Sequence, residues 1–207
     1  MPGSLRYNAA KMLTIIKPVV EKGLQPVARL LKNVNPNTIS LLGLVFPVLF
    51  FILVMKGHYA WALAGFIFIG VDLLDGLVAR AANKVTAFGG FLDSTIDRFA
   101  DFTVISVFGF AGIARWSIVV PLLLLSFLIS YIRSRTELAA KNKLVAAVGL
   151  IERTERMMIV FIGLLLFMFF KSFHLWGFNI AELSLLLLSI LSAYTVAQRI
   201  MFAYQKL

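Results

Sequence analysis

The chain of 207 residues is 60% hydrophobic and 14% charged, which is too apolar for a soluble domain of this length. Its net charge is +10, but basic residues gather in the cytoplasmic loops of membrane proteins, so this charge does not indicate nucleic-acid binding. Cysteine is absent, which excludes disulfides, thiol nucleophiles and thiolate metal sites.

Residues 1–34 are expected to form a cytoplasmic segment beside the membrane. Within it, residues 8–32 repeat apolar side chains at near-helical spacing, with lysines and Arg29 between them. This pattern predicts an amphipathic helix lying at the membrane interface. A short helix packed against the rest of the protein is the alternative interpretation.

Residues 35–207 are predicted to form one all-α membrane domain, because lipid-exposed backbone must satisfy its own hydrogen bonds within helices. Apolar runs predict six transmembrane helices, at residues 38–56, 60–80, 90–112, 117–135, 157–172 and 181–202. Nearly all basic residues fall on the side of the N-terminus, so this side is predicted to be cytoplasmic. Outside the spans, only Lys56, Arg115 and Lys171 are expected to face outward.

Aspartates are concentrated where the second and third predicted spans meet the cytoplasmic side: Asp72, Asp75, Asp93, Asp97 and Asp101. The first two share one helix face, and the other three, spaced by four residues, share a face of the next helix. The short loop between the helices, residues 81–88, predicts antiparallel neighbours. Clustered carboxylates at membrane depth need a compensating cation, and all-oxygen ligands suit Mg²⁺, Mn²⁺ or Ca²⁺. Such a site is typical of phosphoryl transfer.

Small and basic residues accompany the first two aspartates. Gly76 and Ala79 make the same helix face thin, so that a ligand or a neighbouring helix can approach closely, and Arg80 can fork onto a phosphate. Helix packing is the alternative interpretation of the glycines. Thr86, Gly89 and Gly90 suit a loop close to a ligand.

This region resembles the signature of the CDP-alcohol phosphotransferases. Every fixed position is filled, in the order Asp72-x-x-Asp75-Gly76-x-x-Ala79-Arg80 and then Gly89-x-x-x-Asp93-x-x-x-Asp97. The resemblance implies two divalent cations, Mg²⁺ or Mn²⁺, held by Asp72, Asp75 and Asp93, with Asp97 beside the second metal as the general base. It implies contacts to the CDP moiety of the donor from Gly76, Ala79 and Arg80, with Thr86, Asn37 and Thr38 as weaker candidates. Asp101 lies outside the signature and is expected to pair with a nearby basic group.

Arginines further along the chain bear on the acceptor: Arg133, Arg135, Arg153, Arg156 and Arg199. Several arginines at one pocket mouth suit a phosphorylated acceptor, although the positive-inside rule alone also places arginines in the cytoplasm. Residues 130–137 and 149–156 resemble stretches of the phosphatidylinositol-phosphate synthases and their archaeal ether-lipid counterparts, with Arg133 standing where a lysine often does. The resemblance implies inositol 1-phosphate as acceptor and a CDP-linked lipid as donor.

Three other functions stay open at this point. A transferase of the same fold can use glycerol 3-phosphate as acceptor, or CDP-inositol as a soluble donor. An ion-coupled transporter also places aspartates in spans, but it needs charged groups along a through-path, and the outer halves of these spans are apolar. The resemblance further implies a homodimer, and the charges and compact chain favour a multi-pass plasma-membrane protein with its active site facing the cytoplasm.

Overall fold

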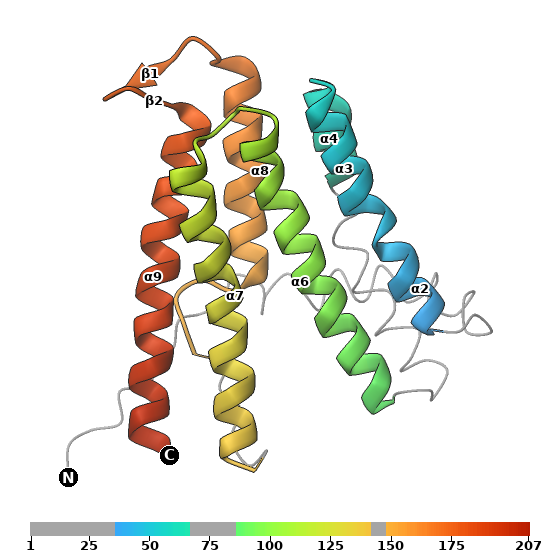
Figure 1. The fold of residues 1–207 in the computed structure, drawn as a ribbon, viewed down its shortest axis with the longest axis vertical. Coiled ribbons are helices and arrows are strands. Elements are labelled where there is room, and N and C mark those ends of the chain that lie inside the picture. The colour runs from blue at the N-terminus through green and yellow to red at the C-terminus, as the bar shows by residue number, and fades with distance from the viewer. Residues whose placement is uncertain (1–35, 67–85, 142–147) are drawn as a thin grey trace, which may run out of the picture. The chain divides into compact units, whose positions relative to one another are not determined.

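The computed structural model describes residues 36–66, 86–141 and 148–207 (Figure 1). The predicted N-terminal amphipathic helix and most of the second predicted span therefore lie outside the described residues. The chain divides into two compact units, residues 1–43 with 70–96 and residues 44–69 with 97–207.

In the first unit, two helix starts follow from the local sequence. Helix α2 (Pro36–Gly43) begins at a proline, whose fixed φ suits the first helical position. Helix α6 (Ala87–Phe110) begins directly after Thr86, whose Oγ1 accepts a hydrogen bond from the Gly89 N–H at 3.0 Å. A side-chain oxygen in this position satisfies one of the open N–H groups of the first helical turn.

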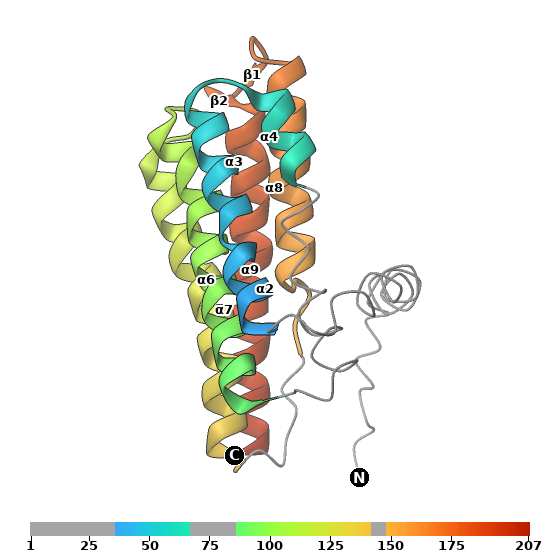
Figure 2. The ribbon, with the colours of Figure 1, turned by 90° about the vertical axis from the view of Figure 1, so that its right-hand side faces the viewer.

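The second unit is a bundle of helices. It contains α3 (Val45–Met55), α4 (Tyr59–Phe66), the part of α6 from Asp97 onward, α7 (Trp116–Ala139), α8 (Arg153–Phe169) and α9 (Ile180–Lys206). Helix α9 packs against both α7 and α8, and α4 packs against α3 and α8. Figure 2 shows α4 beside α8 at the end of the unit that carries the β-strands.

The interior of this bundle is apolar near the strand end and becomes polar further along. Phe108, Leu122, Leu164 and Leu188 are fully buried and belong to one continuous hydrophobic cluster. Buried polar side chains follow, among them Asp101, Ser126, Arg156, Ser192, Thr195 and Arg199. Buried polar and charged groups need hydrogen-bond partners, so this half of the interior is a candidate position for a functional site.

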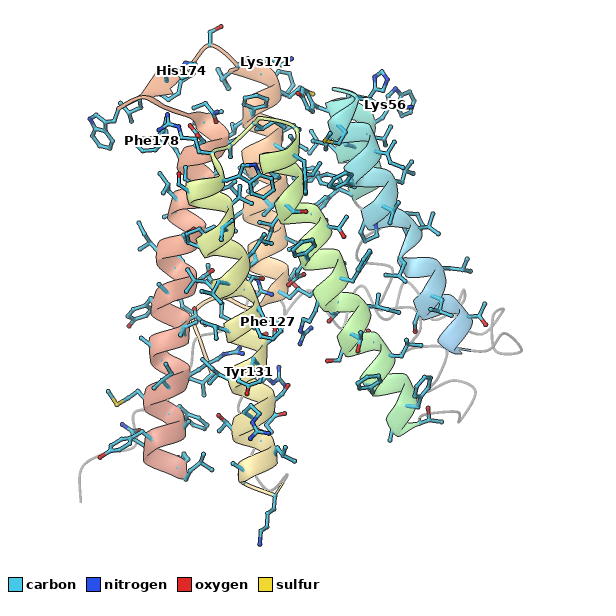
Figure 3. All side chains as sticks on the ribbon, viewed as in Figure 1. Lys56, Phe127, Tyr131, Lys171, His174 and Phe178 are labelled. Atoms are coloured by element: carbon cyan, nitrogen blue, oxygen red, sulfur yellow. The ribbon has the colours of Figure 1, made fainter. Side chains whose placement is uncertain are left out.

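A small hairpin connects α8 to α9, and the sequence did not predict it. Strands β1 (His174–Leu175) and β2 (Phe178–Asn179) pair antiparallel, with His174 opposite Asn179. Trp176 and Gly177 form the turn, both with positive φ, 52° and 76°. Figure 3 shows Lys56, Lys171 and His174 at this end of the unit, and Tyr131 lies far from it. Lys56 and Lys171 thus lie at the same end of the unit, and their predicted outward orientation stays a prediction.

A set of polar contacts fixes the start of α9 to the connection between α6 and α7. Asn179 and Glu182 form a capping box, and the Asn179 amide also donates to the Ile113 carbonyl at 2.7 Å. Glu182 accepts the Arg115 backbone N–H at 3.1 Å and forms an ion pair with the Arg115 side chain at 3.3 Å. The Arg115 guanidinium also donates to the Gly177 carbonyl.

Within the described residues, the predicted spans are mostly helical: 38–56 contains α3 and most of α2, 60–66 belongs to α4, and the last four spans contain most of α6, α7, α8 and α9. The number of membrane spans stays a prediction. Of the described helices, α7 and α9 are long and apolar enough to cross a membrane, and Ser40–Met55 is a shorter apolar stretch. Large apolar side chains on these two helices are exposed, such as Phe127 on α7 and Ile190 on α9, as lipid contact requires. Helix α7 continues to Ala139, beyond the predicted end at residue 135, and α8 begins at Arg153 rather than at residue 157.

Candidate active site

Helix α6 carries the acidic face that the sequence predicts. Asp93, Asp97 and Asp101 follow one another at intervals of four residues within this one continuous helix. The Asp97 side chain is 19% exposed, and the Asp101 side chain is 5% exposed. The face therefore enters the interior of the second unit at Asp101, with Asp97 at the margin.

Two arginines at the start of α8 meet these carboxylates. The Arg153 guanidinium bridges both of them, with Nη1 2.5 Å from Asp97 Oδ1 and Nε donating to Asp101 Oδ1 at 3.1 Å. Arg156 donates from Nη2 to the other oxygen of Asp101 at 2.6 Å. The Ser126 hydroxyl from α7 completes the contacts at 3.4 Å. The expectation that Asp101 pairs with a basic group is confirmed, and its partners are two of the predicted acceptor arginines.

The ion pairs compensate charges that are buried inside the bundle. Arg156 is only 1% exposed, and an isolated charge so deeply buried carries a desolvation penalty of several kcal/mol. Asp101 compensates that charge with a short, charge-assisted hydrogen bond. At the bundle margin, Arg98 adds a further ion pair to Asp97 at 3.3 Å from the same helix.

The position of both arginines depends on how α8 begins. Glu152 and Glu155 form a capping box, in which each side chain accepts the backbone N–H of the other residue. This fixes Arg153 as the first helical residue and Arg156 three positions later, so that both fall on the same side of the first turn.

The segment before α8 is fastened to α9 by a row of hydrogen bonds. The Ile151 N–H donates to Thr195 Oγ1 at 3.1 Å, and the Leu150 N–H donates to Gln198 Oε1 at 2.9 Å. Gly149 has a φ of 136°, and a Cβ at this position would lie 2.5 Å from the Thr195 methyl carbon. The close approach thus requires glycine.

Arg199 on α9 is part of the same junction. Its Nε donates to the Val148 carbonyl at 2.7 Å, and its Nη1 donates to the Ile129 carbonyl on α7. Arg133 and Arg156 lie near enough to interact electrostatically with its guanidinium. Arg133 itself pairs with Glu137 at 3.1 Å. The structure thus brings four of the five predicted acceptor arginines into one neighbourhood.

The remaining predicted residues are placed only in part. Arg135 is exposed on α7, Thr38 is exposed on α2, Asn37 lies in the first turn of α2, and Thr86 precedes α6. The other donor and metal candidates lie outside the described residues: Asp72, Asp75, Gly76, Ala79 and Arg80. Among the residues with described positions, no group of three potential metal ligands occurs, so the predicted metal site stays a prediction.

Several residues of this junction were not predicted from the sequence. Ser126, Thr195 and Gln198 are ordinary polar residues of apolar helices, and no motif distinguishes them. Gly149 begins a stretch that resembles the family, but nothing in that stretch marks it as a point of close contact. The clearest available signal was Asp101, which continues the four-residue spacing of Asp93 and Asp97 and therefore had to lie on their helix face.

Comparisons with known proteins place most of the chain in one family. The family model described as CDP-alcohol phosphatidyltransferase matches residues 33–199. The archaetidylinositol phosphate synthase of Pyrococcus horikoshii is 34% identical over 206 residues, covering 95% of this chain and 98% of the relative. The phosphatidylinositol phosphate synthase of Mycobacteroides abscessus is 36% identical over 179 residues, covering 80% of this chain and 75% of the relative.

A solved structure shares the fold. The phosphatidylinositol phosphate synthase PgsA1 of Mycobacterium tuberculosis, crystallised with CDP-DAG bound, superposes with a TM-score of 0.72 at 28% identity, covering 87% of this chain and 92% of that chain. A second structure of that enzyme, in complex with manganese and citrate, gives a TM-score of 0.71 at 27% identity, covering 89% of this chain and 87% of that chain.

Proposed function

Because this chain belongs to the CDP-alcohol phosphatidyltransferase family, we propose that it transfers a phosphatidyl-type group from a CDP-linked lipid to a hydroxyl of inositol 1-phosphate and releases CMP. Membership makes it a CDP-alcohol phosphotransferase of phospholipid biosynthesis. The names of the two relatives differ in their lipid part and share the inositol phosphate part. This shared part supports inositol phosphate over glycerol 3-phosphate as the acceptor.

One observation carries the proposal: Arg153 contacts Asp97, the proposed general base, at 2.5 Å. A guanidinium binds phosphate as well as carboxylate, because its N–H groups match two oxygens of either. An acceptor whose phosphate is held by Arg153 therefore brings its own hydroxyl groups within reach of the Asp97 carboxylate. A neutral alcohol acceptor makes no use of this arrangement.

In the proposed reaction, Asp97 takes the proton of the attacking hydroxyl. The hydroxyl oxygen forms a bond to the β-phosphorus of the donor, and the bond from that phosphorus to the oxygen shared with the α-phosphate breaks. The electron pair leaves with CMP. Positioning and charge compensation supply most of the catalysis in such phosphoryl transfers, so the arginines matter as much as the base.

The proposal includes two divalent cations, Mg²⁺ or Mn²⁺, held by Asp72, Asp75, Asp93 and Asp97. The donor set fits these ions, because carboxylate oxygens are the ligands they prefer and the last two aspartates lie one turn apart on α6. When bound, such ions neutralise charge on the diphosphate. The structure of the related M. tuberculosis enzyme in complex with manganese supports this part of the proposal.

The substrates are assigned to two groups of residues. We assign the CDP moiety to Gly76, Ala79, Arg80, Thr86, Asn37 and Thr38, and the acceptor phosphate to Arg133, Arg135, Arg153, Arg156 and Arg199. The junction formed by the start of α8 and the adjoining part of α9 supports the second assignment: Arg153 and Arg156 both bond Asp101, and Arg199 bonds the Val148 carbonyl just before α8.

The same proposal covers the membrane arrangement. The enzyme is a homodimer in the plasma membrane, with six transmembrane helices per chain, an N-terminal amphipathic helix and an active site that faces the cytoplasm. Two features support the membrane-spanning part of this arrangement. Helices α7 and α9 have the length and apolarity of spans. The three basic residues predicted to face outward lie at the hairpin end of the second unit, where Arg115 donates to the Gly177 carbonyl and Figure 3 shows Lys56 and Lys171.

The test is CMP release by the purified full-length chain with CDP-lipid and Mg²⁺ or Mn²⁺, comparing inositol 1-phosphate, glycerol 3-phosphate, serine and free inositol. We expect turnover with inositol 1-phosphate and a loss of about 10²- to 10⁴-fold in kcat for Asp97→Asn, as is typical for removal of a general base. Glu182→Gln, which alters a carboxylate at the hairpin end, is the control and should retain kcat. Turnover with glycerol 3-phosphate alone would overturn the acceptor assignment.

A further inference from the structure

We propose that Asp101 is a positioning residue for the acceptor phosphate, an inference that rests on the proposed function. Asp101 lies one turn beyond Asp97 on α6 and takes no part in the proposed proton transfer. Each of its carboxylate oxygens accepts from a different arginine of α8, at 3.1 Å from Arg153 and 2.6 Å from Arg156. One buried carboxylate thus fixes the separation of two proposed phosphate-binding groups.

Asp101 also sets how Arg153 meets the proposed base. Arg153 reaches Asp97 through Nη1 and Asp101 through Nε, so its planar guanidinium is held at two points. Without Asp101, the same guanidinium is free to turn and to pair more fully with Asp97. The acceptor phosphate would then compete with the Asp97 carboxylate for the Arg153 guanidinium. Asp101 therefore keeps Arg153 oriented between the phosphate and the base.

Charge alone predicts the opposite effect, which makes the inference testable. Two arginines and one aspartate carry a net charge of +1, and removing Asp101 raises it to +2, which by itself attracts phosphate more strongly. Geometry acts against this gain. Arg156 is 1% exposed, so without its carboxylate it is a buried, uncompensated charge that is also repelled by Arg153. Arg153 and Arg156 then move apart and no longer bind a single phosphate together.

The experiment measures the KM of inositol 1-phosphate and of CDP-lipid separately, for the parent chain, Asp101→Asn, Asp101→Glu and Glu182→Gln. We expect Asp101→Asn to raise the acceptor KM at least tenfold and to leave the donor KM within twofold. Asp101→Glu keeps the charge and should give an intermediate acceptor KM. Glu182 is equally buried, at 4% exposure, and is paired with Arg115, so its variant loses a comparable ion pair without changing the acceptor KM.

The outcomes separate this inference from the proposed function. An unchanged or lowered acceptor KM in Asp101→Asn overturns the positioning role, and so does an equal rise in Glu182→Gln. Turnover of the parent chain with glycerol 3-phosphate alone overturns the acceptor assignment, while the KM of that acceptor in the same variants still decides the role of Asp101.

A second readout covers loss of activity or of folding. The rise in melting temperature on adding inositol 1-phosphate requires no turnover. A rise in the parent chain that is absent in Asp101→Asn and present in Glu182→Gln supports the positioning role, and an equal rise in all of them overturns it. No rise in the parent chain, together with no CMP release, overturns both proposals. If Asp101→Asn does not fold, Asp101→Glu decides by the same two measurements.

Discussion

Replacing Gly149 with alanine should destabilise the protein through two separable effects. The backbone φ of 136° lies in a region that other residues adopt only with strain, at a cost of about 1–3 kcal/mol. The new methyl would also lie 2.5 Å from the Thr195 methyl carbon, which is fully buried and cannot move into open space. If Thr195 rotates away, the hydrogen bond from Ile151 to its hydroxyl is lost, which adds roughly 1 kcal/mol.

The expected sum is about 2–4 kcal/mol, and for a chain of this size each kcal/mol lowers the melting temperature by about 2–4 °C. We therefore expect Gly149→Ala to lower the melting temperature of the detergent-solubilised protein by roughly 5–15 °C. Thermal unfolding monitored by intrinsic tryptophan fluorescence provides the measurement. Gly112 is the matched control, because its φ is 67° and a Cβ added there would meet nothing within 4 Å, so that Gly112→Ala carries backbone strain without a clash.

The double variant Gly149→Ala with Thr195→Ser separates the two effects. Serine keeps the hydroxyl that Ile151 needs and removes the methyl group that clashes. We expect it to recover the part of the loss due to the clash and to leave the backbone strain. A melting temperature of Gly149→Ala within about 1 °C of the parent chain would refute the reasoning, because backbone strain and steric overlap of this size lower the stability of a packed interior.

Three further predictions concern charge, capping and metal. Arg156→Met leaves the buried Asp101 carboxylate with fewer partners and should destabilise the protein by about 3–5 kcal/mol in the same thermal assay. Arg133→Met removes a partly exposed ion pair with Glu137, one helical turn away, and should cost less than about 1 kcal/mol. Asn179→Ala removes the cap of α9 and the bond to the Ile113 carbonyl, so a loss of about 1–2 kcal/mol is expected in denaturant unfolding, with the acceptor KM unchanged. Chelation of divalent cations should abolish CMP release, and readdition of Mg²⁺ or Mn²⁺ should restore it; activity that survives chelation would contradict the proposed metal site.

Within the described residues, periodicity was sufficient to predict most of the helical segments and the shared face of Asp93, Asp97 and Asp101. Apolar runs and the four-residue spacing from Asp93 to Asp101 depend only on neighbours along the chain, and both appear in the structure. The end of α7 was placed too early because its last turns are polar. There Arg133 and Glu137, one turn apart, form an ion pair within the helix.

The hairpin was missed for a different reason. Its turn needs positive φ at two successive residues, and the usual sequence signal for such a turn is Asn-Gly or Asp-Gly. Here Trp176 precedes Gly177, so half of that signal is absent, and each strand is only two residues long. Nothing in such a short apolar and aromatic stretch distinguishes it from an ordinary loop.

The candidate site could be predicted only in part, because its contacts join distant parts of the chain. Arg153 was a candidate phosphate ligand because of its charge, but its contacts with Asp97 and Asp101 join residues more than fifty positions apart. Those contacts depend on how α6 and α8 pack, which no local pattern specifies. The same holds for Gly149, whose need for glycine arises from the Thr195 side chain on another helix.

Polar bonds at two levels of α9, in its first turn and beyond its middle, restrict how this helix can slide along its axis. Apolar side chains against lipid distinguish poorly between one axial position and the next, since a small shift exchanges one apolar contact for another. Glu182 in the first turn of α9 and Thr195 further along are separated by about 20 Å of helix, and each is bonded to a different connection. A shift by one residue, about 1.5 Å along the axis and 100° around it, breaks both sets together. Helix α9 thereby fixes the distance, along its axis, between the arginine junction and the hairpin end of the bundle.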